Sequence, residues 1–255
     1  MMKNKDLTDS LQDTLEEKNV SRQHDLLMER VNQHKPKNSK SKQDDKNIYI
    51  AMKKVIDYLD VRFGNSIKDY NIVFSKEISI SYMIDLIKTK DLRNEFCYDY
   101  LDRKIKPDGG VLYLVKKDNS FKKPILISEI KRQGTNAERL KKGLPKQATG
   151  NAIERLGKNL IGIRSMMNHE RITPFICFGW GDDFKPTEKT VLSKVFVMNE
   201  FYPLNKIYVN KKDGDANLNR FSPVSMFFRE KIWTVDEMFE IMKEIAETSL
   251  RYYIY

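Results

Sequence analysis

Lys106-Pro107-Asp108-Gly109-Gly110 opens the segment that decides the fold, which runs on through an apolar stretch to Glu129-Ile130-Lys131-Arg132-Gln133-Gly134. Asp108 lies between a proline and two glycines, so we expect it at an exposed bend that opens a strand. The runs Val111–Val115 and Pro124–Ile130 are aliphatic and β-branched, and a polar turn separates them. This pattern predicts a β-hairpin.

The second strand of this hairpin alternates in chemical character. A period of two places Glu129 and Lys131 on one face, and Ser128 and Ile130 on the other. Because a hairpin brings the start of its first strand near the end of its second, we expect Asp108 beside Glu129 and Lys131. Two carboxylates with open positions suit Mg²⁺, and a lysine beside that ion can orient or deprotonate a water. The pattern indicates phosphodiester hydrolysis; the alternative is a solvated strand face, where Asp and Glu-x-Lys patterns also occur.

A helix is predicted from Asn151, and it has two different faces. Its apolar residues recur at core spacing, at Ile153, Leu156, Leu160, Ile163 and Met167. A separate polar face carries Asn151, Glu154, Arg155 and Lys158. Asparagine can make a bidentate contact with adenine, and arginine can contact guanine or phosphate. The polar face is therefore either a DNA-reading surface or a solvated one.

Four blocks of the chain, in order and spacing, resemble the EcoRI-type restriction endonucleases of the PD-(D/E)XK superfamily, the EcoRI/MunI/RsrI family. The blocks are residues 105–110, 129–134, 150–159 and, near the end of the chain, 238–242 with 248–251. Arg132 in the second block is also similar to the MunI-type enzymes. The resemblance implies an α/β fold in a single domain, with a restriction-endonuclease-like mixed five-stranded sheet flanked by helices.

The resemblance also implies roles for individual residues. Asp108, Glu129 and Lys131 would be the catalytic set, and Mg²⁺ would be held by Asp108, Glu129 and the Ile130 carbonyl. The segment that leads into the predicted helix, and its first turn, would read bases, which makes the candidates Ala148, Gly150, Asn151, Ala152 and Arg155. Glu154 would organise Arg155 and cross a dimer interface. Lys106 and Gln133 complete the expected DNA-binding set.

The function implied is that of a type II restriction endonuclease. It would act as a homodimer on double-stranded DNA, cut a palindrome containing AATT, and leave 5′-phosphates, with a companion methyltransferase protecting the host DNA. GAATTC is the expected site, while CAATTG and a shorter AATT core stay open. Two alternatives are a PD-(D/E)XK repair nuclease that recognises DNA structure, and a DNA-binding protein without catalytic activity.

Composition and charge agree with a polyanionic partner. The 255 residues carry a formal net charge of +10, which favours phosphate neutralisation and counterion release. The two cysteines, Cys97 and Cys177, are far apart and support neither a disulfide framework nor a zinc site. No stretch is apolar enough to span a bilayer and no export signal is seen, so we expect a soluble, cytoplasmic protein.

Other elements follow from spacing and capping. We expect a mobile basic arm over residues 1–46 and the endonuclease domain over residues 47–255. Helices are predicted over 48–63, 79–88 and 191–202, a buried strand over 173–178, and solvated loop acids at Asp182 and Asp183. Thr234 and Glu237 form the capping box of a last helix.

Overall fold

The structure is a computed structural model of the chain. It describes residues 39–87, 102–134, 136–145, 151–184, 191, 193–195, 197, 206–209 and 225–255. The chain divides into two units, residues 1–40 and 41–255, and nearly all described residues belong to the second. Residues 1–38 of the predicted arm, which was expected over residues 1–46, lie outside the described residues. The boundary of the arm therefore stays a prediction. No helix within the described ranges is long and apolar enough to cross a membrane.

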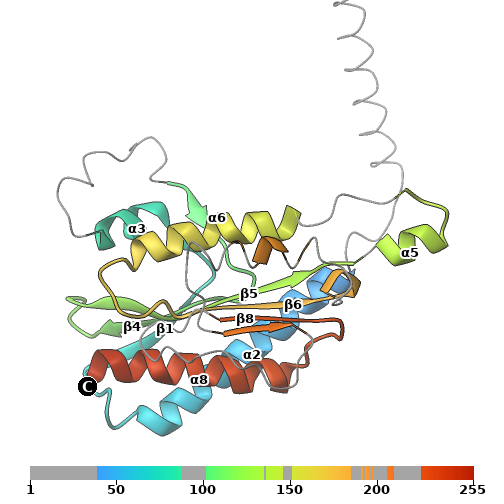
Figure 1. Cartoon of the computed structure of the whole chain (residues 1–255). Coiled ribbons are helices and arrows are strands. Elements are labelled where there is room, and N and C mark those ends of the chain that lie inside the picture. Colours follow the sequence, from blue (N-terminus) through green and yellow to red (C-terminus); the bar gives the residue numbers. More distant parts are fainter. Residues whose placement is uncertain are drawn as a thin grey trace, which may run out of the picture. The chain divides into compact units, whose positions relative to one another are not determined.

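A mixed six-stranded sheet forms the framework of the second unit (Figure 1). In spatial order its strands are β1 (Tyr70–Ser75), β4 (Gly110–Lys116), β5 (Lys122–Arg132), β6 (Phe175–Trp180), β8 (Ser225–Arg229) and β7 (Lys206–Val209). β4 is antiparallel to both of its neighbours, β1 and β5, whereas β5, β6, β8 and β7 run parallel. The hairpin of β4 and β5 confirms the prediction. A separate small sheet pairs β2 (Ile78–Ser79) with β3 (Lys104–Ile105).

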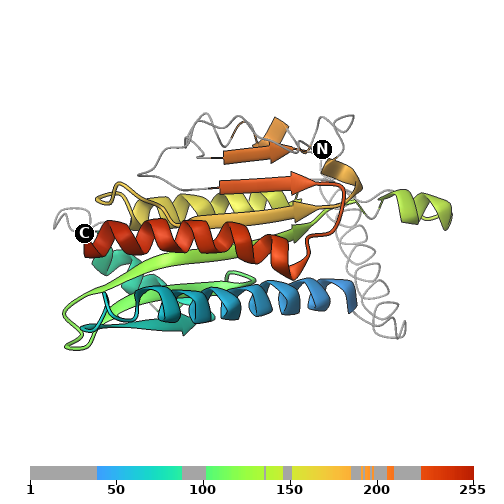
Figure 2. The same cartoon turned by 90° about the horizontal axis from the view of Figure 1, so that it is seen from below.

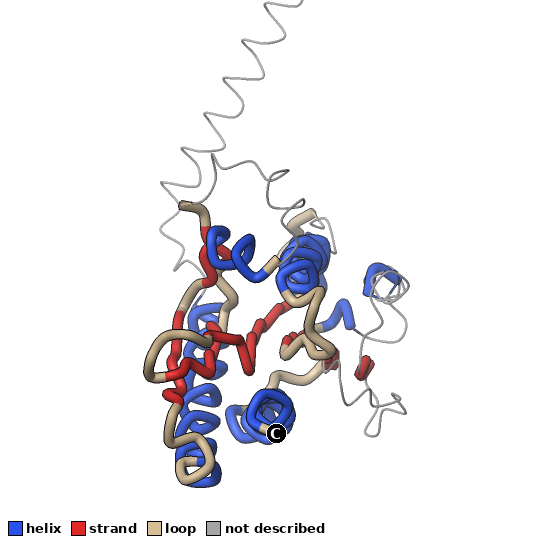
Figure 3. Tube along the Cα trace, turned by 90° about the vertical axis from the view of Figure 1, so that its left-hand side faces the viewer, coloured by secondary structure: helices blue, strands red, loops and turns tan. Residues whose placement is uncertain are grey.

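Helices cover both faces of the six-stranded sheet (Figures 1 and 3). On one face, α2 (Ser39–Phe63) and α8 (Val235–Ile254) lie side by side and share a core with Leu112 and Leu114 of β4 (Figure 2). On the other, α6 (Asn151–Met166) and α3 (Ile80–Leu86) share a core with Val111 and Tyr113. Because alternate residues of a strand point to opposite faces, β4 supplies both cores. Two short elements remain, α5 (Asn136–Lys141) and the 3₁₀ helix η2 (Asp182–Phe184).

The predicted core stripe of α6 is confirmed. Ile153, Leu156, Leu160, Ile163 and Met167 are each at most 1% exposed. Burial of one such aliphatic side chain contributes about 1.5–3 kcal/mol, so the stripe firmly attaches α6 to the sheet. The opposite side of the helix stays in solvent at Glu154 and Arg155.

The predicted fold class, a mixed sheet flanked by helices, is confirmed. Strands β1, β4, β5, β6 and β8 form the main sheet, and the short edge strand β7 adds a sixth member. The helix predicted over 48–63 begins earlier, at Ser39. Apolar spacing alone missed this first part, because the residues before Ile48 are almost all polar. The described positions of the helix predicted over 191–202, namely 191, 193–195 and 197, are helical.

One prediction after β6 is wrong. Asp183 was expected to be a solvated loop acid, but it is only 9% exposed and lies in η2. The neighbouring Phe184 is fully buried in the α6-side core, so η2 folds back over the sheet and carries Asp183 inward. The sequence shows two adjacent acids and contains no local sign of this return.

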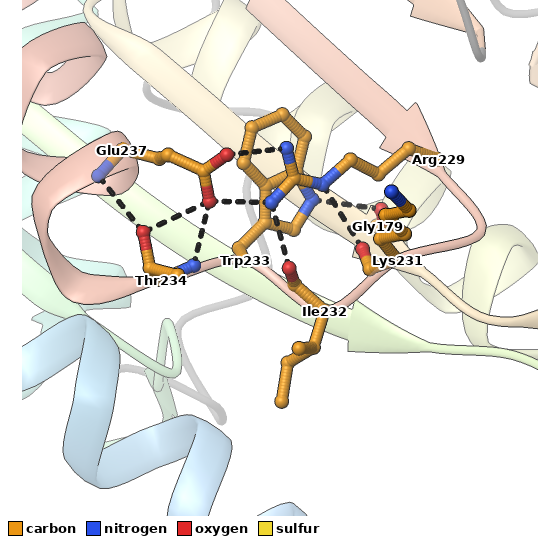
Figure 4. Close-up of polar contacts among 7 residues, drawn as sticks. All are labelled: Gly179, Arg229, Lys231, Ile232, Trp233, Thr234 and Glu237. Atoms are coloured by element: carbon orange, nitrogen blue, oxygen red, sulfur yellow. Dashed lines mark hydrogen bonds and ion pairs between the residues drawn. The ribbon is translucent and has the colours of Figure 1, made fainter.

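The junction of β8 and α8 is held by Arg229 (Figure 4). Its guanidinium makes two bonds to the Glu237 carboxylate, at 2.7 and 2.5 Å, and donates to the Ile232 carbonyl at 2.6 Å. It also lies 3.6 Å from the centre of the Trp233 ring. The Trp233 indole in turn donates to the Gly179 carbonyl of β6 at 2.9 Å. These contacts tie the start of α8 to the strand next to β5.

We predict a pH-dependent loss of stability for Glu237→Gln. The Arg229 guanidinium, with help from the Thr234 cap, lowers the pKa of Glu237 from 4.5 to about 2. A carboxylate with a lowered pKa stabilises the fold above its unfolded pKa, and this contribution is lost as the pH falls through the folded value. Because this side chain is partly exposed, we expect a loss of about 1 kcal/mol at pH 7.

Denaturant unfolding of wild type and variant at several pH values measures this effect. The difference in unfolding free energy should shrink as the pH falls below about 4.5. Glu244→Gln, an exposed acid on the same helix, serves as the control. A difference that is constant between pH 7 and pH 3 would show that the Glu237 charge is not responsible.

Candidate active site

The bend that carries Asp108 is held by the backbone of β5. The Gly109 N–H donates to the Ser128 carbonyl at 3.0 Å. Gly110 has a φ of +79°, and a Cβ at this position would lie 2.6 Å from a ring atom of Phe74. The positive φ and the lack of room for a Cβ both require glycine at position 110. The bend that this glycine allows places Asp108 directly before β4.

The structure brings the three predicted catalytic side chains together. The Lys131 Nζ lies 2.5 Å from Oδ2 of Asp108 and 3.0 Å from Oε1 of Glu129. The Asp108 backbone N–H donates to Oε2 of Glu129 at 2.7 Å, and the Ile130 N–H donates to Oδ2 of Asp108 at 3.3 Å. Two carboxylates at the open end of the hairpin, one before its first strand and one on its second, thus share one ammonium and two backbone donors. Their catalytic and metal-binding roles stay predictions.

Burial sets the electrostatics of this cluster. Glu129 is 2% exposed, and burial raises its pKa, while Lys131 opposes the rise. Burial would lower the pKa of Lys131, but Glu129 and Asp108 together raise it above its usual range. Lys131 is therefore an ammonium at neutral pH, and it compensates the negative charge of the two acids.

Two further residues near the cluster were not predicted as site residues. Asn159 of α6 donates from its side-chain amide to Oε1 of Glu129 at 3.4 Å. Asp45 of α2 is exposed by surface area and lies within electrostatic reach: partial desolvation and Asp108 raise its pKa, and Lys131 opposes the rise. A polar residue beside the apolar stripe of α6 is a sequence signal that could have identified Asn159. Asp45 comes from a helix more than 60 residues before Asp108, so only the fold could identify it.

The donor set fits a divalent cation that keeps water and substrate in its shell. Asp108, Glu129 and the Ile130 carbonyl are oxygen donors of the kind that Mg²⁺ prefers. Across the described residues, no group of three or more His, Cys, Asp or Glu side chains forms a closed metal site. With only these three protein donors, a cation held here would keep open positions for water and substrate.

The ends of β5 and β6 next to Lys131 approach each other closely. The Gln133 N–H donates to the Trp180 carbonyl at 2.9 Å, which continues the strand pairing. Gly181 has a φ of +125°, and a Cβ there would lie 1.5 Å from the Gln133 carbonyl oxygen. Gly134 has a φ of +112°, and its Cβ would lie 2.3 Å from the Asp182 nitrogen. Gln133, predicted to bind DNA, thus lies just beyond β5, against the end of β6 and two residues after Lys131.

Other predicted DNA-binding residues lie on the surface. Arg155 is exposed on α6, and the exposed Glu154 forms an ion pair with Lys194, a contact that sequence reasoning missed. Lys106 is 73% exposed, and its Nζ lies 3.7 Å from Glu77. The expected interplay of Glu154 with Arg155 across a dimer stays a prediction.

The side chains of the remaining predicted base-reading residues are not among the described parts of the structure. Ala148 and Gly150 lie outside the described residues. Asn151 and Ala152 begin α6, and only their backbone is described. The three catalytic candidates are therefore brought together by the structure, while the predicted DNA-reading segment is described in part.

Comparison with known proteins identifies the family of this chain. A family profile described as "Restriction endonuclease EcoRI" matches residues 34–254. The chain therefore belongs to the EcoRI restriction endonuclease family.

Two relatives lie within this family. The type II restriction enzyme RsrI of Cereibacter sphaeroides is 28% identical over 177 residues, which are 58% of this chain and 63% of that protein. The type II restriction enzyme EcoRI of Escherichia coli is 31% identical over 179 residues, which are 58% of this chain and 64% of that protein. The chain thus spans slightly less than two thirds of the length of these relatives.

We predict that Gly181→Ala strongly destabilises the protein. The added Cβ would overlap the Gln133 carbonyl, so the ends of β5 and β6 would have to separate, at a cost of about 3 kcal/mol or more. Gly143→Ala is the matched control, because its φ of +67° is also positive but nothing lies within 4 Å of the added Cβ. Thermal denaturation should show a loss of only about 1 kcal/mol for the control. Equal losses for the two variants would contradict the proposed overlap.

Proposed function

We propose that this chain is a type II restriction endonuclease that makes Mg²⁺-dependent double-strand cuts in DNA. The cut site would be a palindrome containing AATT, with GAATTC as the expected sequence, and the products would carry 5′-phosphates. Membership of the EcoRI restriction endonuclease family supports the reaction class. The names of the two relatives, both type II restriction enzymes, support the site-specific activity.

The observation that carries this proposal is the contact of Lys131 with both Asp108 and Glu129. A lysine that touches two carboxylates at the end of a strand combines a candidate cation site with a donor for a phosphate or a water. The formal net charge of +10 agrees with a DNA substrate.

Asp108, Glu129 and the Ile130 carbonyl would hold the metal. A bound Mg²⁺ supplies charge stabilisation at the scissile phosphate and lowers the pKa of a bound water. Asp108 is oriented for this role by the Ile130 N–H, and Glu129 by the Asp108 N–H and the Asn159 amide. These donors reduce the freedom of both carboxylates before any substrate arrives.

Lys131 would act directly on the attacking water and on the scissile phosphate. Its Nζ lies between two acids, both of which raise its pKa, so it is placed to donate hydrogen bonds. We infer that it positions the attacking water and neutralises charge that develops on the phosphate. Glu129 is buried and the Lys131 side chain is only 18% exposed, so charge interactions of these two groups are stronger than in open water.

Sequence recognition would come from the start of α6 and the segment before it. Gly150, Asn151, Ala152 and Arg155 are the base-reading candidates, with Ala148 just before them. Two copies related by a two-fold axis match a palindromic site, so we propose a homodimer in which each subunit cuts one strand. A companion methyltransferase in the host would protect its DNA without forming a complex with this chain.

The first test is digestion of a fully sequenced plasmid in Mg²⁺, with every end mapped by sequencing. Wild type should cut at one AATT-containing palindrome, and chelation of the metal with EDTA should stop cleavage. Asp108→Ala and Lys131→Ala should each lower the cleavage rate by about 1,000-fold or more, because both remove parts of the transition-state stabilisation. Asp118→Ala, an exposed acid at the far end of the hairpin, should cut as wild type does.

Other outcomes of this digestion point to other functions. Cleavage of branched DNA without cleavage of linear AATT sites would indicate a structure-specific repair nuclease. Tight binding of AATT duplexes in Mg²⁺ without any cutting would indicate a DNA-binding protein that lacks catalysis.

A second test concerns recognition by Arg155. Arg155→Ala should weaken binding to the cognate duplex by about 10- to 100-fold, since one bidentate base contact contributes about 1–3 kcal/mol of discrimination. Binding to a duplex without the site should change little. Lys243→Ala removes a cation from α8, on the opposite face of the sheet, and serves as the control. Equal loss of affinity for both duplexes would assign Arg155 to phosphate contact.

A further inference from the structure

The small sheet of β2 and β3 lies beside the bend that carries Asp108. Its strand β3 ends at Ile105, three residues before Asp108. Ile78 and Ile105 pack into the core on the α6 side of the main sheet. Asn159 of α6 reaches Glu129 from this same side. The small sheet therefore borders the side of the main sheet on which the catalytic candidates lie.

One carboxylate of this small sheet holds two lysines. Glu77 directly precedes β2, and its Oε1 forms an ion pair with Lys104 of β3. Its Oε2 lies 3.7 Å from the Nζ of Lys106. Because alternate residues of a strand share a face, Lys104 and Lys106 project together, away from the core that receives Ile105. Both lysines remain accessible, since their side chains are 45% and 73% exposed.

The segment that carries Glu77 is held against the bend before β4. The Ser75 Oγ donates to the Glu77 carbonyl at 2.8 Å and accepts from the Glu77 N–H at 3.3 Å. A Cβ on Gly110 would lie 2.7 Å from the Ser75 carbonyl oxygen, so this segment touches the bend itself. Lys106 is two residues from Asp108, which limits the distance between their Cα atoms to about 7 Å. The two lysines therefore lie next to the place where the scissile phosphate would be held.

The contacts of Glu77 with the two lysines can be exchanged for contacts with DNA. Exposed ion pairs contribute little to stability, so these contacts can be broken with little loss. The hydrogen bond from Lys104 lowers the pKa of Glu77, which keeps the carboxylate charged at neutral pH. A DNA phosphate offers an ammonium the same kind of charge-assisted hydrogen bond as a carboxylate does. Glu77 and a DNA strand at this site would therefore compete for the same two ammonium groups.

We propose that Lys104 and Lys106 form a contact site for DNA phosphates beside the scissile one, and that Glu77 occupies this site until DNA displaces it. This inference rests on the proposed function and on the expected role of Lys106 in DNA binding, and it adds Lys104 and Glu77. Glu77 lowers the affinity of the protein for DNA of any sequence, because phosphate contacts carry no base information. It thereby weakens non-specific binding, from which the enzyme must dissociate to find its cleavage site.

The test is equilibrium binding of two labelled duplexes in EDTA, one with the site that wild type cuts and one without it. Glu77→Gln should bind both duplexes about 5- to 10-fold more tightly than wild type at about 50 mM salt, and this gain should shrink about 3-fold at about 200 mM. Lys104→Met should weaken binding of both duplexes and reduce the slope of log K against log salt by about one. Asp118→Asn removes an exposed acid that pairs with Lys116 at the far end of the hairpin, and it should bind as wild type does.

A background without the two lysines separates competition from a general effect of charge. In the Lys104→Met/Lys106→Met variant, Glu77→Gln should raise DNA affinity by at most about two-fold, because the carboxylate no longer blocks a cation and its repulsion of DNA is screened by salt. An equal gain in both backgrounds would overturn the proposal. All variants should unfold with wild-type stability, since exposed ion pairs contribute little to it.

The plasmid digestion keeps this test apart from the proposed function. If wild type cuts its site while Glu77→Gln and Lys104→Met bind DNA as wild type does, only the present proposal fails. If wild type binds duplex DNA but cuts none, the proposed function fails, and the salt dependence still decides whether Lys104 contacts phosphate. If wild type binds no duplex, both proposals are overturned.

Discussion

The ion cluster of Lys131 with Asp108 and Glu129 is the interaction on which the rest of the structure depends. Glu129 is almost fully buried, and a buried carboxylate without compensation is strongly destabilising. One ammonium in contact with both acids compensates their charge. The fold must therefore bring the start of β4 and the end of β5 within about 3 Å of one another at the level of side-chain atoms.

The backbone around this cluster meets that requirement through glycines and strand order. Gly110 allows the bend before β4, and Gly181 allows the ends of β5 and β6 to touch. The parallel pairing with β6 leaves β5 in the interior of the sheet, where α6 can cover Glu129 from one side. Arg229 contacts Trp233 and Glu237 at the start of α8, and the Trp233 indole donates to Gly179 of β6. These contacts tie α8 to β6, the strand that pairs with β5 on the side away from β4.

Features that depend on residues close together in the chain could be predicted from the sequence, whereas features that depend on packing between distant residues could not. The hairpin, the core stripe of α6 and the capping box of Thr234 and Glu237 were all predicted, because each depends on residues close in the chain. The early start of α2 and the burial of Asp183 were missed. Both depend on packing against distant parts of the sheet, and the local sequence in each case is polar.

The sequence by itself determined the candidate chemistry and the class of fold. Asp108, Glu129 and Lys131 occupy a hairpin whose alternation and turn residues require them to converge, and the family resemblance rests on the same blocks. Only the tertiary structure decided what surrounds them: Asn159 of α6 on Glu129, and Ile48 of α2 against the bend that carries Asp108. The physical reason is that α2 and α6 are separated from the hairpin in sequence, so their contacts with it arise from core packing on the two faces of the sheet and not from any local pattern.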